Sequence, residues 1–75
     1  MSLYYFNIKD GREIIDEVGT ELGSIAEVRE EAVETGGRII AELGDEFWEH
    51  PVWTMTVTDE AKTVVLTLTF AGKQH

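Results

Sequence analysis

The chain has 75 residues, of which 43% are apolar and 28% charged, and this is the composition of one small globular domain spanning residues 1–75. Its net charge of -9 at pH 7 disfavours contact with nucleic acid and with anionic membranes. The absence of Cys excludes disulfides, thiolate nucleophiles and Cys-based metal sites. No apolar run approaches the roughly 20 residues that span a bilayer, so we expect a cytoplasmic protein.

The first part of the chain has the pattern of a β-hairpin. Side chains alternate from Leu3 to Ile8 and are largely apolar on both faces, which favours a central strand. Asp10-Gly11 supplies the residue types of a tight turn, and residues 12–15 can return as a short second strand. Residues 16–23 combine glycines and acids without a period, so we expect a connecting loop there.

One amphipathic helix is predicted from Ser24 to Gly44. Ser24 and Glu27 have the spacing of a capping box, and Gly44 is typical of a C-terminal cap. At about 100° per residue the helix has one apolar stripe, with a mostly acidic side opposite. The predicted stripe consists of Ile25, Val28, Ala32, Gly36, Ile39 and Leu43, and is widened by Ala26, Val33 and Ile40.

The pair Gly36-Gly37 in this helix needs an explanation, because two glycines cost on the order of 2 kcal/mol relative to two alanines. Gly36 falls on the apolar stripe, so a missing side chain there would let the helix approach the sheet closely. The alternative is a break in the helix at this point.

The last third of the chain predicts a second hairpin after a loop over residues 45–51. Residues 53–58 alternate between large apolar side chains and threonine. After a turn at residues 59–62, residues 63–70 alternate again, with Val64, Leu66 and Leu68 on one side.

These elements predict an α+β fold of the form ββαββ. A right-handed crossover gives a four-stranded antiparallel sheet in the order 2-1-3-4, with the single helix packed on one face. The other face is left open. We expect it to carry Tyr5, Asn7, Thr54, Thr56, Thr58, Val65, Thr67 and Thr69.

No residue set predicts catalysis, a cofactor or a metal ion. Ser24 is assigned to the helix cap, and the many carboxylates lie in loops or on a solvated helix face. Glu46, Glu49 and His50 could approach a divalent cation, but a closed metal site needs four fixed ligands. We therefore expect no enzyme; the alternative is a small-ligand or metal-dependent enzyme site between subunits. Its candidate residues are Asp16, Glu17, Glu46 and His50.

The sequence does contain candidates for an interaction surface. The outer strands of the sheet have unpaired backbone groups that can accept another strand, and the flat threonine-rich face can pack on a partner. Trp48 and Trp53 are either buried anchors or exposed contact residues. The candidate surface residues are Tyr5, Trp48, Trp53, Thr56, Val65 and Thr67.

Several short motifs are shared with one known family. These are Tyr4-Tyr5-Phe6, Asp10-Gly11, Asp16-Glu17-Val18-Gly19 with Glu21-Leu22, and Val57-Thr58-Asp59-Glu60. With them the sequence resembles a family of short bacterial domains of unknown function, which implies no activity or cofactor. Ala61-Lys62 departs from the relatives, which often have a glycine in this turn.

More loosely, the hairpin, the acidic loop and the capped helix resemble the body of HicB-type antitoxins, without their DNA-binding segment. That resemblance implies that a small basic protein is a conceivable partner. Together the residues favour a non-enzymatic interaction or regulatory domain, homodimeric through a sheet edge or the open sheet face. The net charge of -9 makes a basic protein a suitable further partner.

Overall fold

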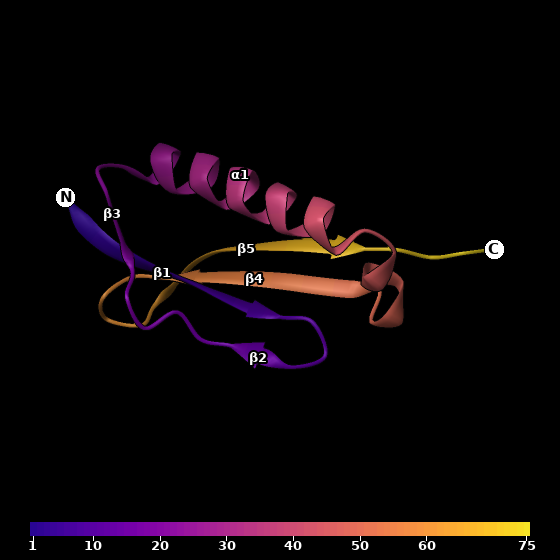
Figure 1. Cartoon of the computed structure of the whole chain (residues 1–75). Helices are drawn as coiled ribbons and strands as arrows, with labels where there is room; N and C mark the ends of the chain where they lie inside the picture. The colour runs from indigo at the N-terminus through magenta and orange to yellow at the C-terminus, as the bar shows by residue number, and fades with distance from the viewer.

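In the computed structural model, which describes residues 1–75, one helix lies across one face of an antiparallel sheet (Figure 1). The strands are β1 (Ser2–Lys9), β2 (Glu13–Ile14), β3 (Thr20–Leu22), β4 (Val52–Thr58) and β5 (Val64–Ala71). The helices are α1 (Ile25–Leu43) and the short 3-10 helix η1 (Gly44–Glu49). The predicted α+β class is therefore confirmed.

The main path of the sheet runs in the order β2-β1-β4-β5, as expected for the four predicted strands. The structure adds a fifth strand, β3, so the prediction that residues 16–23 form only a loop is wrong. In β3, Thr20 lies opposite Tyr4 and Leu22 opposite Ser2. Three residues without apolar alternation carry no strand signal, and the free edge of β1 is what makes them a strand.

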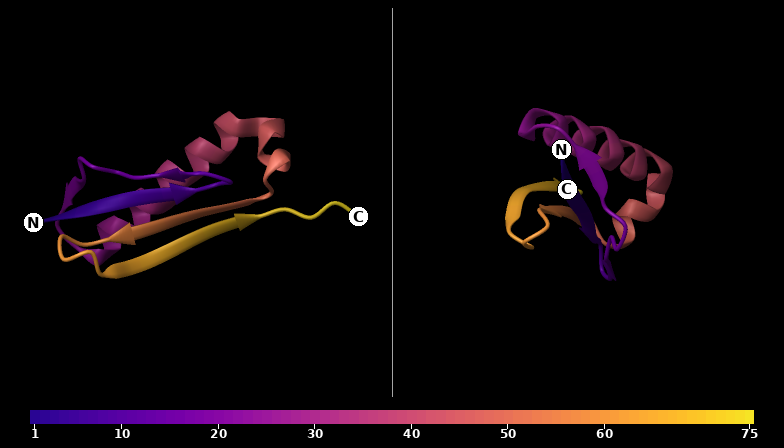
Figure 2. Two further views of the ribbon diagram at one scale, coloured as in Figure 1. Left: turned by 90° about the horizontal axis from the view of Figure 1, so that it is seen from below. Right: turned by 90° about the vertical axis from the view of Figure 1, so that its left-hand side faces the viewer.

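The core lies between α1 and the strands, and Figure 2 shows the helix crossing the sheet diagonally on one side only. Trp53, Met55 and Val57 of β4 point toward the helix and are each 0% exposed. From the helix, Val28 and Ala32 complete this buried cluster. The strict alternation predicted for β4 thus places its large side chains inside and its threonines on the open face.

Helix α1 begins where the capping box predicts. The backbone N–H of Glu27 donates to Ser24 Oγ at 3.3 Å, and the Glu27 carboxylate accepts the backbone N–H of Gly23. At the other end Gly44, with a φ of 56°, terminates the helix as predicted. The cap therefore fixes the first turn of α1 directly to the end of β3.

The helix continues without a break through Gly36 and Gly37. Gly36 is buried, and a Cβ built there would lie 3.2 Å from Leu68 Cδ2 and 3.4 Å from Trp53 Cη2. The close-approach explanation therefore holds for Gly36. A Cβ at Gly37 would meet no atom within 4 Å, so the packing within this chain does not explain the second glycine.

The apolar stripe of α1 is narrower than predicted. Val28, Ala32 and Gly36 are buried, whereas Ile25 is 48% and Val33 61% exposed. The prediction that Val33 widens the buried stripe is thus wrong, because a single layer of strands covers only the side of the helix that faces it.

Two other local predictions need correction. Residues 45–49 belong to the 3-10 helix η1 and not to an irregular loop. In β5, Val57 lies opposite Leu66 but Thr58 opposite Val64, so Val65 is an extra residue in a bulge. The bulge leaves Val64 56% exposed and packs Val65 against the buried cluster, which reverses the sides predicted for these two valines.

The turn between β4 and β5 has an unusual backbone position at Lys62. Its φ is 65°, in the left-handed region that non-glycine residues rarely adopt. Asp59 holds the turn, since its Oδ1 accepts the backbone N–H groups of Ala61 at 2.9 Å and Thr63 at 3.0 Å. This is the turn in which a glycine would be the ordinary choice.

We expect Gly36→Ala and Gly37→Ala to differ in their effect on stability. Gly37→Ala should raise the free energy of unfolding by about 0.5–1 kcal/mol, since it adds helix propensity in open space. Gly36→Ala gains the same propensity but forces Leu68 and Trp53 apart, and should be about 1 kcal/mol less stable than Gly37→Ala. Urea denaturation at low protein concentration measures both. Equal effects would contradict a close contact at Gly36.

We also expect Lys62→Gly to stabilise the chain. Glycine relieves the strain of the left-handed backbone at position 62, but it also adds conformational entropy to the unfolded state. The net effect should be a free energy of unfolding that is higher by about 0.5–1 kcal/mol. Thermal denaturation should compare this variant with the control Ala61→Gly. Ala61 has no positive φ, so a glycine there relieves no strain. A loss of stability in Lys62→Gly would show that the turn is not strained.

Candidate interaction surfaces

The outer edge of β1 is closed along its whole length, but not by one continuous strand. β3 pairs with Ser2, Leu3 and Tyr4, and β2 pairs with Ile8 and Lys9. The gap between them is filled by Asp16, whose Oδ2 accepts the backbone N–H of Phe6 at 3.1 Å. In return, the backbone N–H of Asp16 donates to Asn7 Oδ1 at 2.9 Å. A side chain therefore takes the place of a missing strand residue.

Asp16 also organises its own turn. Its Oδ1 accepts the backbone N–H groups of Val18 and Gly19, both at 3.0 Å. Partial burial acts to raise the pKa of Asp16, but the hydrogen bonds from Gly19, Phe6 and Val18 outweigh it, so the pKa lies below the usual 3.8. The Asp16 carboxylate, a candidate for an enzyme site, thus accepts backbone N–H groups with both of its oxygens.

The opposite edge of the sheet is open. β5 has eight residues and pairs only with β4, so one side of its backbone has no strand partner (Figure 2). No charged residue lies between Lys62 and Lys73, whereas natural edge strands are commonly protected by charge or proline. Leu66, Leu68 and Phe70 lie on the helix side of this edge and are only half-buried.

Three of the predicted surface residues lie together on the face away from α1. Thr56 and Thr67 are opposite each other on β4 and β5, and Tyr5 on β1 lies opposite Thr58. The aromatic ring of Tyr5 lies against Gly19, so the turn of Asp16 covers part of this face. The remaining open surface is mainly threonine and asparagine, which is a polar and well-solvated lining.

The other predicted surface residues do not join them. Trp53 is 0% exposed and lies under the helix, where its ring meets Phe70 edge-on at 5.5 Å, so its assignment to the surface is wrong. Val65 packs against the buried cluster at the bulge. Trp48 is 48% exposed and belongs to η1, where its ring lies against Gly72 beyond the end of β5.

The four residues proposed for an enzyme site are in two separate places. Glu46 and His50 line a cavity of about 280 Å³ between η1 and the β1–β2 turn, together with Asp10 and Arg12. Asp16 and Glu17 line a different hollow, on the open face beside Tyr5 and Lys62. No group of three or more His, Asp or Glu side chains is placed to hold a metal ion.

Two buried polar atoms beside the first cavity have no hydrogen-bond partner. They are Asp10 Oδ1 and the indole Nε1 of Trp53, and both residues line the cavity. Neither atom is reachable from solvent, since each exposes less than 1 Å². The cavity therefore offers mainly the exposed carboxylates of Glu46 and Glu49 and the imidazole of His50.

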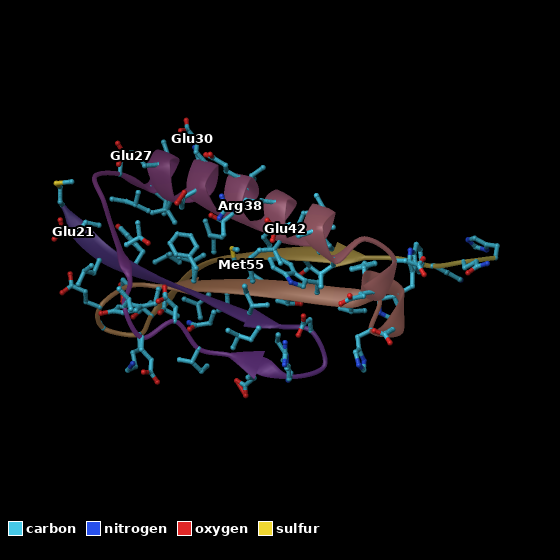
Figure 3. All side chains as sticks on the ribbon, viewed as in Figure 1. Glu21, Glu27, Glu30, Arg38, Glu42 and Met55 are labelled. Carbon is cyan, nitrogen blue, oxygen red and sulfur yellow. The ribbon has the colours of Figure 1, made fainter.

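The two flanks of α1 differ in character. One side is acidic and carries Glu27, Glu30, Glu34 and Glu42, which are all exposed. Figure 3 shows Glu27 and Glu30 pointing away from the sheet, in contrast to Met55 beneath the helix. The other flank lies toward β5, because Gly36 contacts Leu68 and Phe70. It carries Ala26, Arg29, Val33, Gly37 and Ile40.

Sequence reasoning missed three features of these surfaces. The first is the bonding of the Asp16 side chain to the backbone. The Asp-x-x-Gly spacing gives a partial signal for it, because it is typical of a side chain that accepts the backbone N–H groups of the residues two and three positions later. The exposure of Val33 and the open space at Gly37 have no sequence signal of their own. Both depend on where the sheet ends beneath the helix.

The fold defines a small α+β domain with a four-stranded path, one covering helix and one open edge. The chain belongs to the family described as a domain of unknown function, DUF6894, whose family model matches residues 3–71. This confirms the resemblance to a short domain family of unknown function. The comparisons with curated proteins and with solved structures gave no match. The similarity to HicB-type antitoxins stays a prediction.

No helix of the chain combines the length and apolar character needed to cross a membrane.

The lowered pKa of Asp16 predicts a dependence of stability on pH. A group whose pKa is lowered in the folded state stabilises it fully above the unfolded value, here about 3.8, and that stability is lost as pH falls below this value toward the folded pKa. Asp16→Asn should lower the free energy of unfolding by about 1–2 kcal/mol at pH 7, since its amide nitrogen cannot accept the N–H of Phe6.

Urea denaturation at a series of pH values between 2 and 7 tests this. The Asp16 contribution is the difference between wild type and Asp16→Asn, and it should shrink as the pH falls below about 4. Glu17→Gln is the matched control, because it neutralises the adjacent carboxylate, which is exposed. A difference for Asp16→Asn that is constant with pH would contradict the assigned role.

Proposed function

We propose that this chain is a non-enzymatic protein-interaction domain that forms a homodimer by pairing the β5 strands of two copies. The single observation that carries this proposal is the asymmetry of the sheet. One edge consists of the short strands β2 and β3 with Asp16 between them, while the other, β5, leaves one side of an eight-residue strand without a partner. Unpaired strand edges are templates for a further strand.

Charge supports a second copy at this edge rather than elsewhere. Two chains of net charge -9 repel each other, so self-association is favoured only where carboxylates are absent from the contact. β5 has no charged residue, in contrast to the acidic exposed side of α1. An antiparallel pair of β5 strands would join the two sheets into one continuous sheet.

Packing supports the edge over the open face. Leu66, Leu68 and Phe70 are only half-buried at the β5 edge, and a second sheet would cover them further. The open face presents mainly threonine side chains and Asn7, and its exposed valines, Val52 and Val64, lie at opposite ends of the β4–β5 hairpin, so they form no continuous apolar patch. The acidic flank of α1 stays exposed in such a dimer and would steer a basic protein partner toward it.

A pair of lysines on the edge strand should break the dimer. Thr67 and Thr69 are both exposed, and in an antiparallel pair centred on Leu68 they lie opposite each other across the two-fold axis. A Thr67→Lys, Thr69→Lys variant sets like charges face to face and should weaken dimerisation about tenfold or more. Sedimentation equilibrium over a concentration series measures this, with circular dichroism to verify folding.

The matched control is Thr54→Lys, Thr56→Lys, which adds the same two charges to the partners of those threonines on β4. That variant should keep the dimer, because β4 is an interior strand. If the Thr54→Lys, Thr56→Lys control dissociates while the Thr67→Lys, Thr69→Lys variant stays dimeric, the open face and not the β5 edge forms the dimer contact. A wild-type chain that sediments as a monomer at every concentration would overturn the proposal.

A further inference from the structure

The flank of α1 next to the β5 edge contains two features that the single chain does not explain. Val33 is an aliphatic side chain that is 61% exposed, and Gly37, one helical turn later, has open space where a side chain would be. An exposed apolar residue and an exposed glycine, over which a second backbone can approach closely, suit a helix–helix contact.

These two features are complementary to each other. When two copies of a helix pack antiparallel about a two-fold axis, every contact occurs twice. If residue i of the first copy touches residue j of the second, then residue j of the first also touches residue i of the second. With the axis at the level of residue 35, on the side of the helix that carries Val33 and Gly37, Val33 of each copy faces Gly37 of the other. The side chain of Val33 then enters the space that the missing side chain of Gly37 leaves.

The position of this axis agrees with the pairing of the β5 strands. Gly36 contacts the side chain of Leu68, near the middle of β5, so one two-fold axis can pass near Leu68 in the sheet and beside the Val33–Gly37 flank at the level of residue 35. Gly36 also contacts Trp53, which places the helix over the boundary between β4 and β5. Two such helices lie about 10 Å apart, twice the spacing of strands, which is a packing distance for helices.

We infer that α1 packs against α1 of the second copy through an antiparallel seam in which Val33 inserts against Gly37. The inference rests on the proposed β5 dimer and names the second surface that it buries. Arg29, Glu30 and Glu34 border Val33. In an antiparallel seam centred on position 35, Glu30 faces Ile40 and Glu34 faces Gly36 of the second copy, so no two carboxylates lie opposite each other. The seam also gives the glycine at position 37 a reason, since a side chain there would collide with the partner.

A disulfide tests the geometry directly, because the natural chain has no Cys. Val33→Cys with Gly37→Cys should give a covalent dimer on mild oxidation at concentrations where wild type is dimeric. The control is Glu34→Cys with Arg38→Cys, which has the same spacing on exposed positions of the other side of α1 and should stay without a covalent dimer. Non-reducing gel electrophoresis reports both, and oxidation at the lowest concentration at which wild type is dimeric limits random collisions.

A substitution provides the second measurement. Gly37→Leu places a large side chain where the second helix would approach and should raise the dimer dissociation constant at least tenfold, with helix content kept or increased. Arg38→Leu adds an equal side chain on the other side and should leave the constant within about threefold of wild type.

The outcomes separate the inference from the proposed function. If the edge lysines dissociate the dimer while Gly37→Leu does not and no 33–37 disulfide forms, the β5 dimer stands and the helix seam is wrong. If wild type is a monomer throughout, both fail. A specific 33–37 disulfide together with a weakened Gly37→Leu dimer supports the seam.

Discussion

The contact between Gly36 of α1 and the side chains of Leu68 and Trp53 sets the spacing between the two layers of this small domain. With only one helix over the sheet, every buried side chain depends on that separation, and the buried cluster consists of five residues. A glycine at this position exchanges helix propensity for close packing of an indole ring against the backbone. In a larger protein other elements could compensate for a wider gap, but here none is present.

Patterns with a clear period were sufficient to predict most of the fold. The alternation in β4, the capping box at Ser24 and the terminal Gly44 each gave the correct element, and the crossover rule gave the correct order of the main strands. What failed depends on neighbours that a sequence does not contain. β3 exists because β1 has a free edge beside it, and the sides of Val64 and Val65 depend on a bulge set by pairing with β4.

The candidate surfaces were predictable to a smaller extent. Thr56 and Thr67 follow from strand alternation and lie together as expected, whereas alternation also places Trp53 inside, and its assignment to a surface rested on residue type alone. Asp16 shows the same limit for chemistry. Its carboxylate was counted as available for catalysis because the sequence does not reveal that three backbone N–H groups already occupy it.

The unequal borders of the sheet also bear on how far assembly can proceed. A sheet with two long unprotected borders can keep adding molecules at both ends and grow into a filament. Here the border beyond β1 consists of two strands of only two and three residues, with Asp16 between them, and offers little backbone to a further molecule. The long border at β5 is consumed when two molecules meet, so this inequality would separate a finite complex from open-ended polymerisation.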